Sequence, residues 1–96
     1  MINPEIDQYG TKRWFNDKNQ LHNENGPAIE WISGSIAWWV DGEPHRINGP
    51  AYEYADGTKL WYVDGEIYHY NQTYQKAAGI SDEDMAMIVL KYGNVT

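Results

Sequence analysis

The chain has 96 residues, with 14 acidic against seven basic residues and no cysteine, so the sequence predicts one small domain without disulfides or thiol chemistry. A net charge of −7 argues against direct binding of nucleic acids and of anionic membranes, because both need a basic surface. No apolar run approaches the roughly 18 residues of a membrane span. Residues 1–10 lack the basic and apolar regions of a signal peptide, so we expect a cytoplasmic protein.

A repeat of 23 or 24 residues organises residues 9–70. The sequence "WWVDGE" at 38–43 returns as "WYVDGE" at 61–66, and "NGPA" occurs at 25–28 and again at 48–51. The glycine, tryptophan and aspartate of the unit fall at Gly10, Gly34 and Gly57, at Trp14, Trp38 and Trp61, and at Asp17, Asp41 and Asp64. A fixed period of this length is typical of repeat architectures.

Each repeat reads as two short strands joined by tight turns. Segments such as "AIEWI", "SIAWWV" and "TKLWYV" are rich in β-branched and aromatic residues, which favour strands. The Asp-Gly and Ser-Gly pairs between them predict two-residue hairpin turns, in which both residues have positive φ. Pro27 and Pro50 mark the links between repeats, because proline cannot donate to a strand ladder. The result is an open antiparallel meander.

Two helices are expected at the C-terminal end of the sequence. "NQTYQKAAG" predicts a short helix closed by Gly79, and "SDEDMAMIVLKY" predicts a second one with Ser81 as its N-cap. The second helix carries an apolar stripe of Met85, Ile88, Val89 and Tyr92. An apolar sheet face must be covered, so we expect these helices to pack on one face, with dimerisation as the alternative role.

The predicted fold is therefore a mainly β protein with a single domain over residues 1–96. Three hairpin repeats occupy residues 9–70, and a helical cover occupies residues 71–96. With two-residue turns throughout, Tyr52 lies opposite Trp61 and Ile29 opposite Trp38. One face then holds Ile29, Trp31, Ile36, Trp38, Val40, Tyr52, Tyr54, Trp61 and Val63. The other holds Glu30, Ala37, Trp39, Arg46, Glu53, Leu60, Tyr62 and Ile67.

The recurring polar residues do not predict catalysis or a metal site. His22, His45 and His69 stand one repeat apart, which is about 10 Å for two strands, so they cannot share one ion. We expect these histidines to hydrogen-bond the backbone at the turns between repeats, with a bulge near His69. Glu30 and Glu53 are equally far apart, slightly beyond the separation of an inverting carboxylate pair. The sequence thus predicts a non-enzyme without cofactor or metal.

Residues 9–70 resemble a divergent MORN repeat (membrane occupation and recognition nexus). The resemblance rests on "WVDGEPH" at 39–45 and "YADG" at 54–57, with H-R-x-x-G-P-A at 45–51 in place of the Gly-x-Gly of the common pattern. It implies an open single-layer sheet of stacked hairpins that binds other macromolecules without catalysis. The H-R-x-x-G-P-A variant is similar to segments of small bacterial and phage proteins.

Trp39 and Tyr62 fall on the face that the helices leave uncovered, framed by Glu30, Arg46 and Glu53. A large aromatic residue inside a charged rim is typical of a protein interface. The sequence therefore predicts a non-catalytic binding module, a small phage or bacterial accessory protein that binds and inhibits a host protein, or that pairs with itself as a homodimer.

Two alternatives remain. A sequestering protein for a nucleotide could stack the base on Trp38 or Trp39 and bind a phosphate with Arg46 and His45. A nucleic-acid mimic would need its acidic residues segregated to one side, although Lys12, Arg13, Arg46 and Lys59 lie within the predicted sheet.

Overall fold

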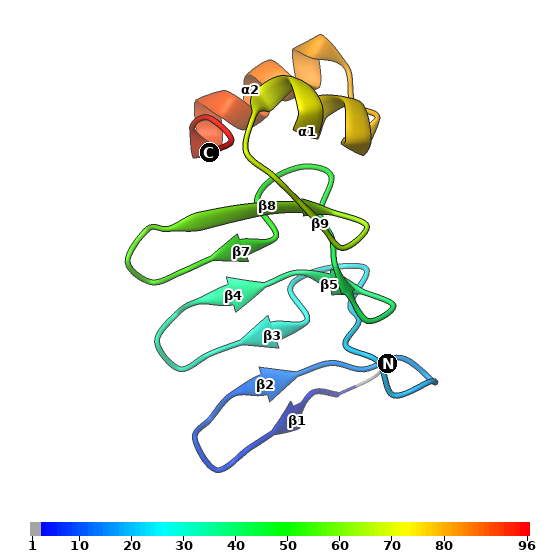
Figure 1. The fold of residues 1–96 in the computed structure, drawn as a ribbon. Coiled ribbons are helices and arrows are strands. Elements are labelled where there is room, and N and C mark those ends of the chain that lie inside the picture. Colours follow the sequence, from blue (N-terminus) through cyan, green and yellow to red (C-terminus); the bar gives the residue numbers. More distant parts are fainter. Residues whose placement is uncertain (1–2) are drawn as a thin grey trace.

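A computed structural model describes residues 3–96 and shows a mainly β protein with two helices after the strands (Figure 1). A seven-stranded antiparallel sheet has the order β1-β2-β3-β4-β7-β8-β9, and β5 pairs with β6 in a separate small sheet. The strands are β1 Glu5–Ile6, β2 Lys12–Arg13, β3 Ile29–Glu30, β4 Ile36–Ala37, β5 Trp39–Val40, β6 Glu43–Pro44, β7 Tyr52–Glu53, β8 Lys59–Val63 and β9 Glu66–Tyr68. The expected open meander is confirmed.

The turns along the chain are of two kinds. Asp41 and Gly42 have φ of 49° and 83°, and Asp64 and Gly65 have φ of 50° and 84°, so these pairs form the expected two-residue turns. On the opposite side of the stack, the loop after β3 is longer: the Trp31 N–H donates to the Ser35 carbonyl, and only the glycine of the loop has positive φ.

The same longer loop joins β7 to β8. The Tyr54 N–H donates to the Thr58 carbonyl, and the Gly57 N–H donates back to Tyr54. Gly57 has a φ of 94°, whereas the Asp56 φ is not positive. These hydrogen bonds and the single glycine with positive φ are those of a three-residue hairpin loop. The prediction of a two-residue turn at this Asp-Gly pair is therefore wrong.

The extra loop residue shifts the strand register by one position. Tyr52 lies opposite Leu60 rather than Trp61, and Ile29 lies opposite Ala37. Because side chains alternate along a strand, a shift of one residue moves a side chain to the other face of the sheet. The predicted composition of the two faces is corrected accordingly.

The two faces of the sheet differ in which aromatic residues they carry. The tryptophan face carries Glu30, Ile36, Trp38, Glu53, Lys59, Trp61 and Val63. The tyrosine face carries Ile29, Ala37, Trp39, Tyr52, Tyr54, Leu60, Tyr62 and Ile67. Glu30 and Glu53 thus lie on the face of Trp38 and Trp61, whereas Glu5 of β1 lies on the face where the tyrosines gather.

The helices begin and end where the sequence predicts. Helix α1 spans Asn71–Ala78 and is closed by Gly79 with a φ of 69°. Helix α2 spans Asp82–Tyr92, and the Ser81 hydroxyl accepts a hydrogen bond from the Asp84 N–H at 3.1 Å. Serine at this position satisfies an N–H group that the helix itself leaves free. Within residues 3–96, neither helix has the length and apolar character that a membrane crossing requires.

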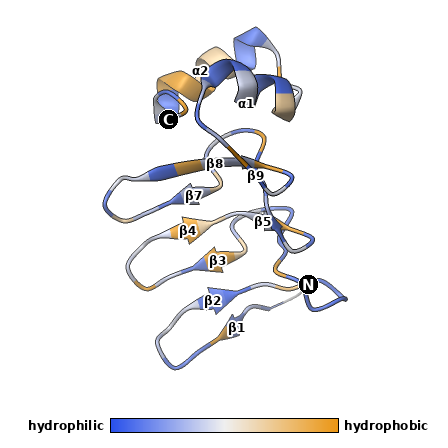
Figure 2. Cartoon of the chain, viewed as in Figure 1, coloured by the Kyte–Doolittle hydropathy of each residue, from blue (hydrophilic) through white to orange (hydrophobic). Residues whose placement is uncertain are grey.

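The helices cover the tryptophan face at β8, at one end of the stack (Figure 1). Their contact with the sheet forms the main core, which consists of Trp61, Val63, Tyr74, Met85, Ile88 and Val95. Trp61 and Tyr74 meet edge to face with ring centroids 4.9 Å apart. Hydrophobic residues also mark β3, β4 and part of α2 (Figure 2). Trp61 is completely buried, whereas its repeat equivalent Trp38 is only half-buried.

Candidate functional site

His22 and His45 connect each repeat to the next. The His22 Nδ1 accepts a hydrogen bond from the Asp41 N–H at 3.0 Å, and the His45 Nδ1 accepts one from the Asp64 N–H at 2.9 Å. Since Nδ1 is the acceptor, the proton of the neutral ring resides on Nε2. The expectation that these histidines bind backbone at the turns is confirmed, and it gives both a structural role.

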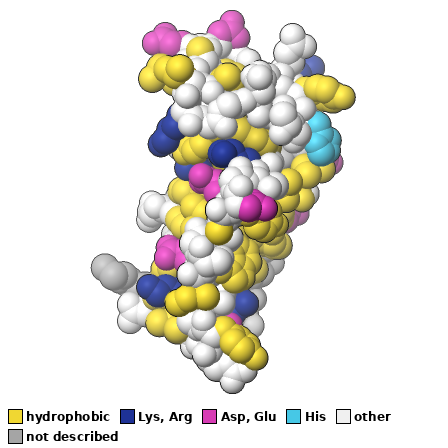
Figure 3. All heavy atoms as spheres, turned by 90° about the vertical axis from the view of Figure 1, so that its left-hand side faces the viewer, with side chains coloured by type: hydrophobic (Ala, Val, Ile, Leu, Met, Phe, Trp, Pro, Cys, Tyr) yellow, Lys and Arg dark blue, Asp and Glu magenta, His cyan; other side chains and the backbone are white. Residues whose placement is uncertain are grey.

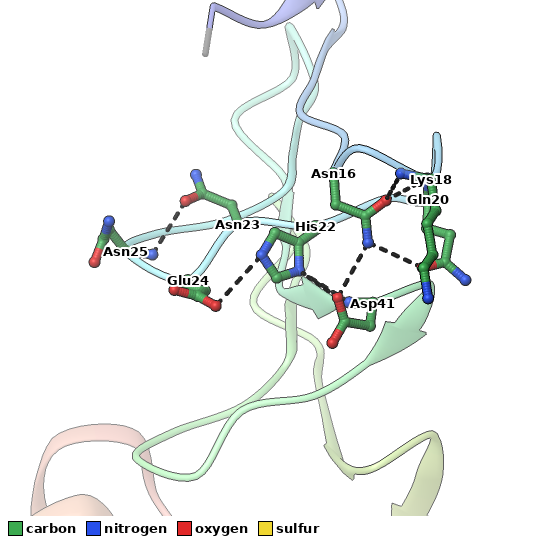
Figure 4. A network of polar contacts seen from close by, with 8 residues as sticks. All are labelled: Asn16, Lys18, Gln20, His22, Asn23, Glu24, Asn25 and Asp41. Carbon is green, nitrogen blue, oxygen red and sulfur yellow. Dashed lines mark hydrogen bonds and ion pairs between the residues drawn. The ribbon is translucent and has the colours of Figure 1, made fainter. Parts of the chain in front are cut away.

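A polar network surrounds His22 (Figure 4). The Asn16 side-chain amide donates to Gln20 Oε1 at 2.9 Å and to Asp41 Oδ1 at 3.0 Å. The His22 Nε2 lies 3.6 Å from a carboxylate oxygen of Glu24. These contacts join the turn at 16–20 to the next hairpin tip, so the network orders the stack.

His69 does not take the place of the third histidine. Trp61 lies opposite Tyr68 in a regular β8–β9 pair, so Tyr68 occupies the position that His45 has in the second repeat. The third repeat has one more residue between its tryptophan and its histidine than the second repeat has. His69 therefore comes after the β8–β9 strand pair, where it is exposed. The bulge expected there is wrong. Among residues 3–96, no three His, Cys, Asp or Glu side chains are grouped as metal ligands.

Arg46 joins the tryptophan face to α2. Its guanidinium carbon lies 3.9 Å from the centre of the Trp38 ring system, and Nη1 contacts a Glu53 carboxylate oxygen at 3.0 Å. The same nitrogen donates to the Pro50 carbonyl at 3.1 Å, and Nη2 donates to the Tyr92 hydroxyl at 3.2 Å. All of these partners belong to the same chain. Arg46 therefore has a structural role, because it connects the sheet to α2.

Four aromatic side chains gather on the tyrosine face and form what we call the aromatic patch: Trp39, Tyr52, Tyr54 and Tyr62. Tyr52 is at its centre, with the Tyr54 ring stacked 5.8 Å away and the Tyr62 ring also at 5.8 Å. The Trp39 indole N–H donates to the Tyr52 hydroxyl at 3.1 Å. Burial raises the pKa of the Tyr52 phenol above its ordinary value, so it stays neutral at physiological pH.

The aromatic patch is accessible to a partner. Tyr54 is 38% exposed, and Ile67 beside Tyr62 is also exposed. Asp41 and Asp64 stand at exposed hairpin tips, two residues after Trp39 and Tyr62. Figure 3 shows hydrophobic side chains following one another along the stack, with both basic and acidic side chains beside them. The aromatic patch thus offers an apolar surface on a chain with a net charge of −7.

The structure divides the six residues that the sequence singles out. Trp39 and Tyr62 share the aromatic patch, as expected. Arg46 and Glu53 meet on the tryptophan face instead, and Glu30 lies on that face opposite Lys12. His45 is held in a turn. The expectation that Glu30, Arg46 and Glu53 frame Trp39 is wrong, because the longer loops shift the register.

Sequence reasoning missed Tyr52 and Tyr54 as members of the site. The signal that could have found them is the turn type, because a single glycine before Ser or Thr also fits a three-residue hairpin loop. With that loop, Tyr52 shares a face with Tyr62.

Comparison of the chain with protein-family models, with curated proteins and with solved structures finds no match. The resemblance of residues 9–70 to MORN repeats therefore stays a prediction. The functional argument rests on the geometry of the chain itself.

Proposed function

We propose that this chain is a non-catalytic binding module that engages a partner protein through the aromatic patch. The observation that carries the proposal is the clustering of four large rings on the sheet face opposite the helices. Tryptophan and tyrosine bring much contact area at a small entropic cost, and they dominate the energetics of protein interfaces. The paired strands bring these rings together on one face before any partner binds.

The partner that fits this surface is apolar with basic residues at its border. The chain carries a net charge of −7, and the exposed Asp41 and Asp64 follow Trp39 and Tyr62 by two residues. Complementary charge raises association rates and discriminates against acidic partners. The resemblance to small phage and bacterial proteins favours a host protein that the module binds and inhibits.

The nucleotide and mimicry alternatives have less support. A nucleotide binder would need the guanidinium of Arg46, which instead contacts Glu53 and Tyr92. A nucleic-acid mimic would need segregated acids, but Lys12 lies opposite Glu30 and Lys59 opposite Glu53. We therefore favour a protein partner.

A displayed library of random peptides tests the proposal without a known partner. Wild-type protein should enrich peptides that combine apolar residues with lysine or arginine. Tyr54→Ala/Tyr62→Ala should bind these peptides at least about tenfold more weakly, because each lost aromatic anchor costs about 1–2 kcal/mol. Tyr54→Ala alone serves as a milder variant that leaves the half-buried Tyr62 in place.

The matched control is Tyr9→Ala/Tyr70→Ala, which removes two exposed tyrosines outside the patch. It should bind as wild type does, and melting curves should show that all variants are folded. Enriched peptides that bind the patch variant normally would contradict the proposal, as would the absence of any enrichment.

A further inference from the structure

Helix α2 carries a second apolar surface on its outer side. Met85 and Ile88 face the core, whereas Met87 is 63% exposed and Leu90 is 82% exposed. Glu83, Met87 and Leu90 are spaced i, i+4 and i+7, so they form one outward stripe. Two large apolar side chains thus stand on the solvent side of an 11-residue helix.

The outward stripe continues into a groove beside the helix. The groove has a volume of about 320 Å³ and is lined by Asn48, Met87, Ile88, Leu90, Lys91 and Tyr92. Ile47, on the link between the second and third repeats, is also exposed next to Asn48. We call Met87 and Leu90, with this groove, the α2 surface. It lies on the helical end of the stack, away from the aromatic patch.

The two ends of α2 carry opposite charges, so the first turn of one copy is complementary to the last turn of another. Its first turn carries Asp82, Glu83 and Asp84, and its last turn carries Lys91. When two copies of such a helix pack antiparallel, each lysine comes beside the acidic turn of the other copy. The two helix dipoles then also oppose one another favourably. A parallel arrangement would bring the like charges together.

We propose that α2 packs antiparallel against α2 of a second copy, across a two-fold axis near Met87. Glu83 of each copy then pairs with Lys91 of the other, because the axis relates positions four residues on either side of Met87. The Leu90 side chains of the two copies then lie on either side of the central Met87 pair. A two-fold interface of this kind uses the same patch on both subunits. It leaves both aromatic patches free.

The contact is expected to be modest in strength. A helix of 11 residues is about 16 Å long. A pair of such helices with the adjoining link buries less than the roughly 1,600 Å² of a standard interface. The dimer should therefore form at micromolar or higher concentrations and dissociate on dilution.

Sedimentation velocity over a concentration series tests the proposal. Wild-type protein should shift from monomer to dimer as its concentration rises, and Met87→Gln/Leu90→Gln should raise the dissociation constant at least about tenfold. Ile6→Gln/Ile32→Gln is the matched control, because these residues are 62% and 83% exposed elsewhere on the chain. The control variant should dimerise as wild type does.

Charge exchange gives a second, more specific test. Glu83→Lys and Lys91→Glu should each weaken the dimer, since each places like charges at both contacts. A mixture of these two variants should associate again, because both contacts then join opposite charges. Circular dichroism checks that the helices persist in each variant.

Three results would overturn the proposal: wild-type protein that stays monomeric at millimolar concentration, a mixture that associates no better than its components, or a dimer lost in Tyr54→Ala/Tyr62→Ala but kept in the Met87→Gln/Leu90→Gln variant.

Discussion

At the scale of single residues, His22 and His45 each accept a hydrogen bond from the first residue of the Asp-Gly turn in the following repeat. His45 accepts the Asp64 N–H, which belongs to a two-residue turn with positive φ at both positions. Because Asp64 lies in a turn, no neighbouring strand offers its N–H a backbone acceptor in place of the imidazole. The histidine thus stabilises the hairpin of the following repeat rather than its own.

We expect His45→Ala to lower the free energy of unfolding by about 1 kcal/mol, because the Asp64 N–H loses its acceptor. His69→Ala removes an exposed histidine of no equivalent role and should change stability by less than about 0.5 kcal/mol. Urea denaturation of both variants measures the difference. Equal losses in the two variants would contradict the assigned role of His45.

The two Gly-Pro pairs differ in the space around the glycine. A Cβ added at Gly49 would lie 2.9 Å from the Tyr92 ring and 3.1 Å from the Arg46 guanidinium carbon. At Gly26 the nearest atom would be the Asn23 side-chain nitrogen at 3.7 Å, an ordinary contact. Only the second glycine lies beneath α2.

Gly49→Ala should therefore destabilise the fold by about 1–3 kcal/mol, since Tyr92 or Arg46 must move. Gly26→Ala should be neutral within about 0.5 kcal/mol. Thermal melts of the two variants distinguish the sites. A Gly49→Ala protein that melts with the wild type would show that α2 does not press on this link.

At the scale of elements, Tyr74 docks α1 onto the link between repeats. Its hydroxyl contacts the Arg46 carbonyl at 2.7 Å, and the Gly49 N–H donates to it at 3.3 Å. The side chain is completely buried. Burial raises the pKa of Tyr74 from 10.0 to about 12, because the phenolate would lose its hydration.

This shift sets a pH dependence. The folded-state pKa is raised, so the contribution of neutral Tyr74 is fully present below pH 10 and is lost as the pH rises toward 12. Tyr74→Phe should lose about 1–3 kcal/mol at pH 8, where Gly49 and Arg46 lose their partner.

The stability difference between wild type and Tyr74→Phe should then shrink as the pH rises above 10. Urea denaturation at a series of pH values measures this difference, and subtracting the two proteins removes the titration of the other tyrosines and the lysines. A difference that stays constant between pH 9 and pH 11 would contradict the docking role.

At the scale of the whole molecule, the core is concentrated at the helical end of the stack. Trp61, Tyr74 and Met85 are buried there, whereas Ile6 in the edge strand β1 is mostly exposed. Each hairpin contacts mainly its neighbours, so stability in such a stack depends on the nearest interfaces.

Hydrogen exchange should therefore show a gradient along the chain. Amides of β8 and α1 should exchange most slowly, and those of β1 and β2 fastest, because local opening there exposes little apolar surface. Exchange measured by mass spectrometry on peptides of each hairpin would reveal the gradient. Uniform protection across all hairpins would instead indicate one cooperative unit.

Local sequence patterns by themselves predict the turns, the helices and part of the aromatic patch. The Asp-Gly turns at 41–42 and 64–65 and the Ser81 cap depend on neighbouring residues only, and they appear as predicted. The position of Trp39 directly after Trp38 in a strand also predicts that these two side chains lie on opposite faces. These features follow from backbone geometry that a few adjacent residues fix.

The tertiary structure decides the strand register and the packing around each link between repeats. The pair Asp56-Gly57 fits either hairpin loop, and the choice between them depends on how β7 and β8 pair, which determines whether Tyr52 joins Tyr62 or Trp61. The two "NGPA" links are identical in sequence, yet only Gly49 is crowded, because α2 packs over it alone. Faces and crowding depend on which segments meet across the fold, and a repeat in the sequence does not contain that information.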